Sequence, residues 1–271
     1  NPGTIVGEVD AEGQAFSGLN IGTPIVVGGA DHVLSAYGAG LTVEGDWLIK
    51  LGGAGDILAV STTEVLDPRL YLDLHPVDGL YLPNGCMATS GSLLRWLQHL
   101  VGDADLLTLD AEAETRTPAD LLCLPYFLGE KSPLHDPDLR GAFVGLHLGT
   151  TRGDMHRAAL EAIAYGFRQH QQILNELGIP TTSARVTNGG SKSTLWKRIL
   201  ASVLQTPLTP VLNHPGASLG AAIAAGMGIG AVDSWDSIQS KKPFLAAERI
   251  PLALKVIIRM RVFSGGQERG P

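Results

Sequence analysis

The chain has 271 residues, of which 44% are hydrophobic and 17% charged, enough apolar material for one large domain or two small ones. Its formal net charge of −7 argues against nucleic-acid binding, which needs a basic face. The two cysteines, Cys86 and Cys123, stand far apart without a CxxC spacing, which argues against a disulfide framework and a zinc site. They favour a reducing compartment, and we expect a cytoplasmic protein.

The first part of the chain predicts two strands and a short helix. Apolar runs at 4–10 and 24–28 are typical of strands, and the "AEGQ" between them indicates a turn. The following "DHVLSAYGAGL" predicts a short helix. Asp31 and His32 stand at its start, where a buried strand is expected to end.

The middle of the chain predicts a glycine hairpin and a helix. "DWLIKLGGAGDILAVST" is typical of two strands around a glycine loop, and residues 79–83 indicate another short strand. "SGSLLRWLQHLV" has leucines at helical spacing, with Ser90 or Ser92 as its expected cap. The next segment, "LPYFLGEKSPLHDPDLRGAFVGL", holds too much Pro and Gly for a continuous helix.

The remainder alternates strands and helices. The longest predicted helix runs from Asp154, its expected cap, to Leu177, with Gly178 at its end. "ARVT" predicts a strand, "NGGS" a turn, "TLWKRILASVL" a helix, "PLTPV" a strand, and residues 217–227 a small-residue helix. That last apolar run is shorter than the roughly 20 residues of a membrane span, so we expect no membrane contact. The alternation indicates an α/β or mixed α+β fold.

Two glycine-rich bends are candidate anion sites. In "LGGAGDI", successive backbone N–H groups would form a concavity for phosphate oxygens, although a plain tight hairpin is the alternative. The segment matches neither the dinucleotide fingerprint nor the P-loop. In "VTNGGSKSTLW", a diglycine before a helix N-terminus favours a ring or an anion, and a plain strand–helix turn is the alternative.

Asp31 is a candidate general base. A carboxylate at the end of a strand, beside glycines, is suited to accept a proton from a substrate hydroxyl. The alternative is a cap for the helix over 32–39. The eight histidines show no metal-ligand spacing, and no GxSxG elbow occurs.

Taken in this order, the segments resemble the FGGY family of carbohydrate kinases, and most of all its xylulokinase- and ribulokinase-like members, which phosphorylate ketopentoses. The resemblance runs from about residue 2 to about residue 240, and "GEKSPLHDPDLRGAFVGL" and "NGGSKSTLW" are its most specific parts. It implies an α/β, actin-like (ribonuclease-H-like) ATPase lobe, the C-terminal domain of a two-lobe sugar kinase. ATP, with Mg²⁺, and the sugar would meet between the lobes.

The resemblance also implies roles for particular residues. Asp31 matches the catalytic base, and His32 follows it where the family often contacts the sugar. Many members carry Thr where Ala54 stands, so the backbone would have to supply that contact here. No residue is assigned to the metal. The positions that match the nucleotide site are Gly53, Ala54 and Gly55 at the phosphate loop, Gly91, Leu94 and Arg95 at a helix start, and Gly189, Gly190, Ser191 and Thr194 at the adenosine turn.

The resemblance divides the chain into the end of the sugar-binding lobe (1–42), the nucleotide-binding lobe (43–240) and an atypical basic tail (241–271). The family's Asp-Gly-rich phosphate hairpin and most of its sugar lobe are missing from the sequence, so we expect an incomplete chain. One hypothesis is an ATP-dependent kinase of a ketopentose or related sugar. The alternative is an inactive fragment that binds nucleotide weakly or acts through protein association, for example as a homodimer. A dehydrogenase is disfavoured, because "GGAGDI" lacks the third glycine of the fingerprint.

Overall fold

The structure, a computed structural model, describes residues 1–116, 120–211, 214 and 216–235, and the predicted tail at 241–271 lies outside them. In chain order the elements are β1 (Ile5–Glu8), α1 (Ala11–Ser17), β2 (Pro24–Val26), α2 (Asp31–Gly38), β3 (Asp46–Leu51), β4 (Gly55–Ala59), β5 (Tyr71–Leu74), β6 (Tyr81–Met87), α3 (Gly91–Leu100), α4 (Leu106–Glu114), β7 (Leu122–Leu124), β8 (Ala142–Val144), α5 (Arg152–Glu176), β9 (Ser183–Thr187), the 3₁₀ helix η1 (Gly189–Lys192), α6 (Thr194–Leu204), β10 (Leu208–Pro210) and α7 (Ala217–Gly228).

A six-stranded mixed sheet forms the centre of the molecule, with the strand order β10-β9-β3-β4-β6-β5. β10 pairs parallel with β9, and β9 pairs parallel with β3, whereas the pairs β3–β4, β4–β6 and β6–β5 are antiparallel. Leu51 pairs with Gly55, so the predicted glycine hairpin is confirmed and only residues 52–54 form its bend. The predicted mixed α/β class is confirmed as well.

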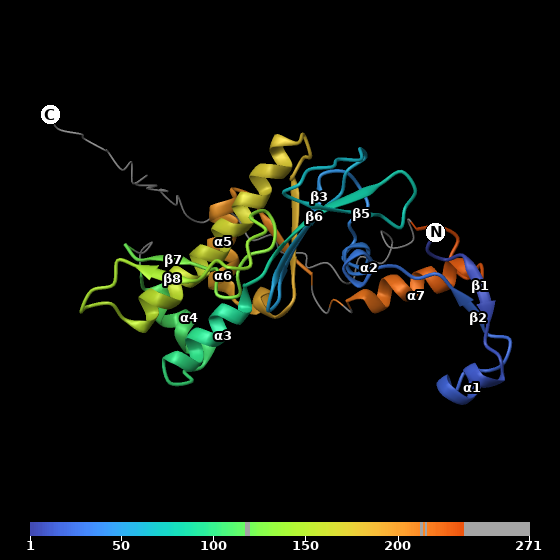
Figure 1. The fold of residues 1–271 in the computed structure, drawn as a ribbon, viewed down its shortest axis with the longest axis horizontal. Coiled ribbons are helices and arrows are strands. Elements are labelled where there is room, and N and C mark those ends of the chain that lie inside the picture. The colour runs from blue at the N-terminus through green and yellow to red at the C-terminus, as the bar shows by residue number, and fades with distance from the viewer. Residues whose placement is uncertain (117–119, 212–213, 215, 236–271) are drawn as a thin grey trace.

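Helices cover both faces of this sheet (Figure 1). Because side chains alternate along a strand, β3 sends Trp47, Ile49 and Leu51 into a core with α5 and α6. Leu48 points to the opposite face, where it packs in a second cluster with Val33 of α2. The strand is therefore buried on both sides and holds the bend that follows it in a fixed place.

Helix α5 begins two residues before its predicted cap. Thr151 is the N-cap residue, and Asp154 completes a capping box by accepting from the backbone N–H of Thr151 at 2.8 Å. The prediction that Asp154 itself is the cap is therefore wrong, because the carboxylate reaches back from the first turn. Gly178 follows the helix with a φ of +78°, as expected for a glycine at a helix end.

Other predictions fail where the apolar pattern is weak. "AEGQ" lies in α1 and not in a turn: Asp10 caps this helix by accepting from the N–H of Gly13, and Gly18 ends it in the left-handed region. α1 buries no residue, so it has no apolar stripe to detect. α4 and β5 were not predicted, and "NGGS" is largely in η1.

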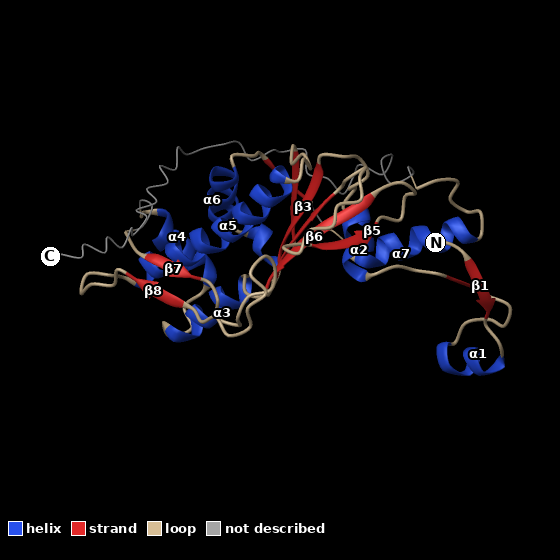
Figure 2. Cartoon of the chain, turned by 45° about the horizontal axis from the view of Figure 1, so that its top comes forward, coloured by secondary structure: helices blue, strands red, loops and turns tan. Residues whose placement is uncertain are grey.

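The N-terminal β1-α1-β2 unit extends away from the sheet beyond α7 (Figure 2). α7 confirms the helix predicted over 217–227 and packs on α2, where a Cβ added to Gly220 would lie 2.5 Å from the carbonyl oxygen of Leu34. A glycine is therefore required for this close approach. None of the helices in the described ranges is both long and apolar enough to cross a membrane.

Candidate functional site

The two glycine bends meet at one edge of the sheet. β3 and β9 are parallel neighbours, with Lys50 in register with Thr187, so the bends that follow these strands leave the sheet side by side. The side-chain nitrogen of Asn188 lies 3.2 Å from a Cβ built on Gly52, which shows how closely they approach. Segments more than a hundred residues apart in the sequence thus form one loop cluster.

The N-terminus of α3 fixes the first bend. The backbone N–H groups of Ser90 and Ser92 donate to the carbonyl oxygen of Gly53 at 2.8 and 3.1 Å, and Gly91 N–H donates to Gly52 at 2.8 Å. A Cβ on Gly91 would lie 2.7 Å from that Gly52 oxygen, so the contact requires glycine. Ser90 occupies the N-cap position, one of the two predicted, but its side chain makes no cap bond, and the Ser92 hydroxyl donates to Gly53.

The predicted glycines divide into two kinds. Gly53 and Gly189 are exposed, and a Cβ on either would meet nothing within 4 Å. Gly55 is the buried first residue of β4, where a Cβ would lie 2.9 Å from an aromatic ring of α5. A Cβ on Gly190 would lie 2.3 Å from the ring of Trp196. The first pair borders open space, whereas the second pair is required by packing.

The second bend is braced by the predicted Ser191 and by three residues that the sequence analysis missed, Ser193, Asp110 and His156. Ser191 donates its hydroxyl to the carbonyl oxygen of Asn188 at 2.6 Å, which closes η1. Ser193 caps α6 and donates to Asp110 of α4 at 2.6 Å, and Asp110 is also 2.8 Å from Nε2 of His156 in α5. Three helices therefore hold the turn. No spacing in the sequence joins Asp110 to residues so far along the chain.

The remaining nucleotide-site candidates lie on helices. Leu94 is 5% exposed and packs in the main core. Arg95, next to it on α3, and Thr194, the first residue of α6, are exposed. Leu94 can therefore act only by supporting α3, whereas Arg95 and Thr194 are accessible to a ligand.

Asp31 starts α2 with its side chain 92% exposed, and His32 lies beside it. Asp31 Oδ1 accepts from the backbone N–H of His32 at 2.7 Å and is 3.3 Å from its Nδ1. His32 Nε2 is 2.7 Å from Oδ2 of Asp73, which also accepts from the side-chain amide of Asn84 at 2.6 Å. Asp73 and Asn84 belong to β5 and β6, and the sequence analysis missed both.

Electrostatics keep Asp31 ionised and connect it to the first bend. The side-chain hydrogen bond from His32 is the largest of the effects that hold the pKa of Asp31 below its ordinary value, and the charge of Lys50 acts in the same direction. Lys50 and Asp56 stand on either side of the bend, one on each strand of the hairpin, and pair at 3.2 Å. The field at this exposed carboxylate is thus set mainly by His32, and the strand that leads into the bend adds a smaller contribution.

Most of the chain matches a known protein family. The FGGY family of carbohydrate kinases, C-terminal domain, matches residues 52–229. The chain belongs to this family. A xylulose kinase structure from Rhodospirillum rubrum is 45% identical with a TM-score of 0.80, and the match covers 92% of this chain and 51% of that one. The family's actin-like ATPase fold, expected from the sequence, is thereby confirmed.

Curated relatives agree with this assignment. The xylulose kinase of Staphylococcus epidermidis is 30% identical over 230 residues, which cover 83% of this chain and 46% of the relative. The gluconokinase of Bacillus subtilis is 27% identical, with coverages of 82% and 46%. The chain thus spans about half the length of the curated relatives it matches, and these relatives act on more than one sugar class.

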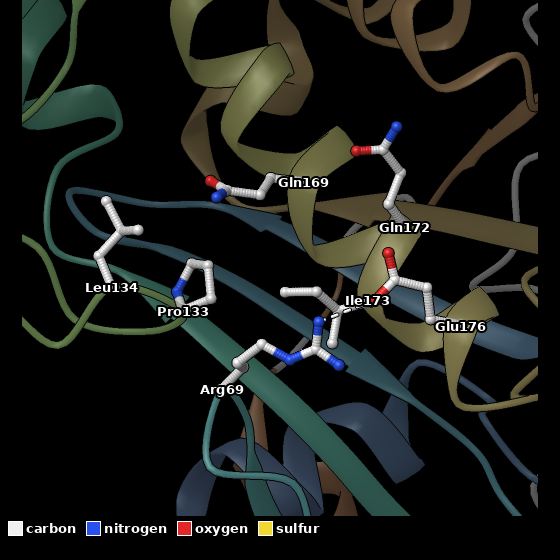
Figure 3. A pocket seen from close by; sticks show the side chains of 7 residues that line it. All are labelled: Arg69, Pro133, Leu134, Gln169, Gln172, Ile173 and Glu176. Carbon is white, nitrogen blue, oxygen red and sulfur yellow. Dashed lines mark hydrogen bonds and ion pairs between the residues drawn. The ribbon is translucent and has the colours of Figure 1, made fainter.

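A pocket of about 240 Å³ lies apart from the loop cluster of the two glycine bends, and Figure 3 shows the side chains around it. The guanidinium of Arg69 donates to Asp67 and to Glu176, so its charge is already balanced and the pocket has no cation left for an anionic ligand. None of the predicted site residues lines it. The lining residues are Arg69, Pro133, Leu134, Gln169, Gln172, Ile173 and Glu176.

Proposed function

We propose that this chain carries the nucleotide site and the general base of an ATP-dependent kinase, which transfers the γ-phosphoryl group of ATP to a hydroxyl of a ketopentose or a related sugar. The observation that carries the proposal is the convergence of both glycine bends at one sheet edge. Asp31 starts α2, which packs on the strand that leads into the first bend, and its lowered pKa keeps it ionised. The similarity to xylulose kinases favours a ketopentose.

In this proposal the first bend binds phosphate. Gly53 and Ala54 offer backbone N–H groups, and the N-terminus of α3 at Gly91 adds a favourable field for anions. Gly55 and Leu94 keep this loop in place through packing. The second bend would receive the adenosine, and Gly189, Gly190 and Ser191 form its turn. Thr194 of α6 and Arg95 of α3 would border the nucleotide.

Asp31 would act as the base. In phosphoryl transfer to an alcohol, the hydroxyl oxygen attacks the γ-phosphorus, ADP leaves, and the hydroxyl proton passes to a carboxylate. Asp31 suits this step because it is exposed and its pKa lies below the ordinary value, so it is unprotonated at neutral pH. His32 lies beside it, but both of its ring nitrogens already face carboxylates.

Mg²⁺ would enter with the nucleotide. Among the described residues, no group of three or more His, Cys, Asp and Glu side chains is arranged to hold a metal ion. When bound, Mg²⁺ neutralises charge on the phosphates.

We also propose a lobe boundary near residue 42 and a cytoplasmic location. The two free thiols, Cys86 and Cys123, suit such a reducing compartment. A homodimer stays a prediction.

A coupled ADP-release assay with a panel of ketopentoses, gluconate and glycerol tests the proposed function. We expect steady turnover of the chain with ATP, Mg²⁺ and at least one ketopentose. ADP binding in calorimetry without turnover on any sugar would instead favour the inactive-fragment hypothesis. Absence of both turnover and ADP binding would contradict the kinase assignment for this chain altogether.

Substitution of Gly53 by Ala tests the phosphate role of the first bend. The added methyl meets nothing within 4 Å, so we expect the free energy of unfolding to change by less than about 1 kcal/mol. The methyl would occupy the space through which phosphate approaches, and we expect the affinity for ADP to fall about tenfold, or ~1.4 kcal/mol. Calorimetric titration with ADP measures this effect.

Gly7→Ala in β1 is the matched control, because its Cβ also meets nothing within 4 Å. The control should leave the affinity for ADP unchanged. Equal affinities in the wild-type chain and in Gly53→Ala would remove the first bend from the phosphate site.

A further inference from the structure

We propose that Asp73 is a positioning residue for the base Asp31 and acts on it through His32. This inference rests on the proposed function. It follows from a chain of contacts across three elements, in which β5 and β6 hold the imidazole that in turn holds the carboxylate at the start of α2. Asp73 itself need not touch the substrate.

The contacts fix the imidazole at both ends. Nε2 of His32 is 2.7 Å from Oδ2 of Asp73, and Nδ1 is 3.3 Å from Oδ1 of Asp31. A carboxylate only accepts hydrogen bonds, so His32 must donate from both nitrogens, which only the protonated imidazolium can do. Asn84 donates to the same Asp73 oxygen at 2.6 Å and keeps that carboxylate in place.

Burial explains why Asp73, and not Asp31, fixes the position of the His32 ring. The side chain of Asp31 is 92% exposed, whereas those of Asp73 and His32 are 29% and 35% exposed. An exposed carboxylate on the first turn of a helix has several rotamers open to it. A half-buried partner that fixes the neighbouring ring therefore limits where Asp31 can turn and keeps one oxygen bonded, which leaves the other for an incoming hydroxyl.

The charges of the surrounding elements agree with this arrangement. Burial alone would lower the pKa of His32, but the carboxylates of Asp73 and Asp31 outweigh it, and the pKa lies above the ordinary value. Lys50 of β3 is the other charged side chain that acts on Asp31. The imidazolium–carboxylate pair is complete at pH values above the lowered pKa of Asp31 and below the raised pKa of His32. It is lost when either limit is crossed.

The test substitutes Asp73 by Asn, which keeps the shape and removes the charge. The pKa of His32 is measured by NMR of histidine-labelled protein, with the His32 signal assigned by its loss in His32→Gln. We expect the pKa of His32 to fall below the wild-type value in Asp73→Asn and to recover in Asp73→Glu. Asp78→Asn, on the nearby exposed turn, is the matched control and should leave it unchanged. An unchanged pKa of His32 in Asp73→Asn would overturn the proposal.

A second readout separates this proposal from the proposed function. If the chain turns over sugar, Asp73→Asn should move the high-pH limb of kcat to lower pH, because His32 loses its proton, and with it the pair to Asp31, at lower pH, while the KM for ATP stays constant. An unmoved high-pH limb would overturn the positioning role and leave the kinase intact. A lowered pKa of His32 in Asp73→Asn without turnover in any variant would support the contact from Asp73 to His32 and contradict the proposed kinase function. If Asp73→Asn fails to fold, carboxyl NMR of His32→Gln should show a raised Asp31 pKa, and an unchanged one would refute the link.

Discussion

Replacing Asp31 by Asn is expected to lower turnover by about 10²- to 10⁴-fold, the usual contribution of a positioned general base. The amide keeps the size of the side chain but cannot take the hydroxyl proton. The affinity for ADP should stay constant, because the glycine bends are held by α3, η1 and the sheet and not by Asp31. Steady-state kinetics and calorimetry on the same preparation measure the two quantities.

Glu64→Gln is the control for this substitution, since it removes a carboxylate from an exposed loop outside the site. Its turnover should equal that of the wild-type chain. If Asp31→Asn kept most of its turnover, another group would have to accept the proton, and the assignment of the base would be wrong. A parallel loss of ADP affinity would point to a structural role for Asp31 instead.

Local patterns were sufficient to predict the elements that surround the site. The glycine hairpin, α2, α6 and β9 are found where apolar periodicity and glycine placed them, because each buries a face against the sheet. Asp31 and the two bends could be selected for the same reason, as each stands where a regular element begins or ends. Their convergence depends on the parallel pairing of β3 with β9, which no local pattern determines.

The residues that hold the site together could not be predicted in this way. Asp110 and Asp73 lie on elements that the sequence analysis did not detect, α4 and β5, and each contacts a residue at least forty positions away. A single aspartate in a weakly patterned segment carries no signal of such a partner. Supporting contacts of this kind depend on tertiary packing, whereas the exposed glycines of the two bends and Asp31 are marked by local backbone chemistry.

Replacing Trp196 by Ala is expected to lower the free energy of unfolding by about 3–5 kcal/mol. The ring is 1% exposed and packs in the main core between α6 and the sheet, so truncation leaves a cavity. The same ring lies under Gly190, within 2.3 Å of where a Cβ would stand, so the second bend should also lose its support and bind ADP more weakly. Urea denaturation and ADP titration measure the two effects.

Trp96→Ala is the informative comparison, because it deletes the same side chain from a position that is 42% exposed. There the ring contacts Phe127 at a centroid distance of 4.6 Å, and the loss should stay near 0.5–1.5 kcal/mol. Similar losses in both variants would mean that the core does not close over Trp196. The second bend would then have to be held by the hydrogen bonds of Ser191, Ser193 and Asp110, and substitution of Asp110 would become the larger perturbation of nucleotide binding.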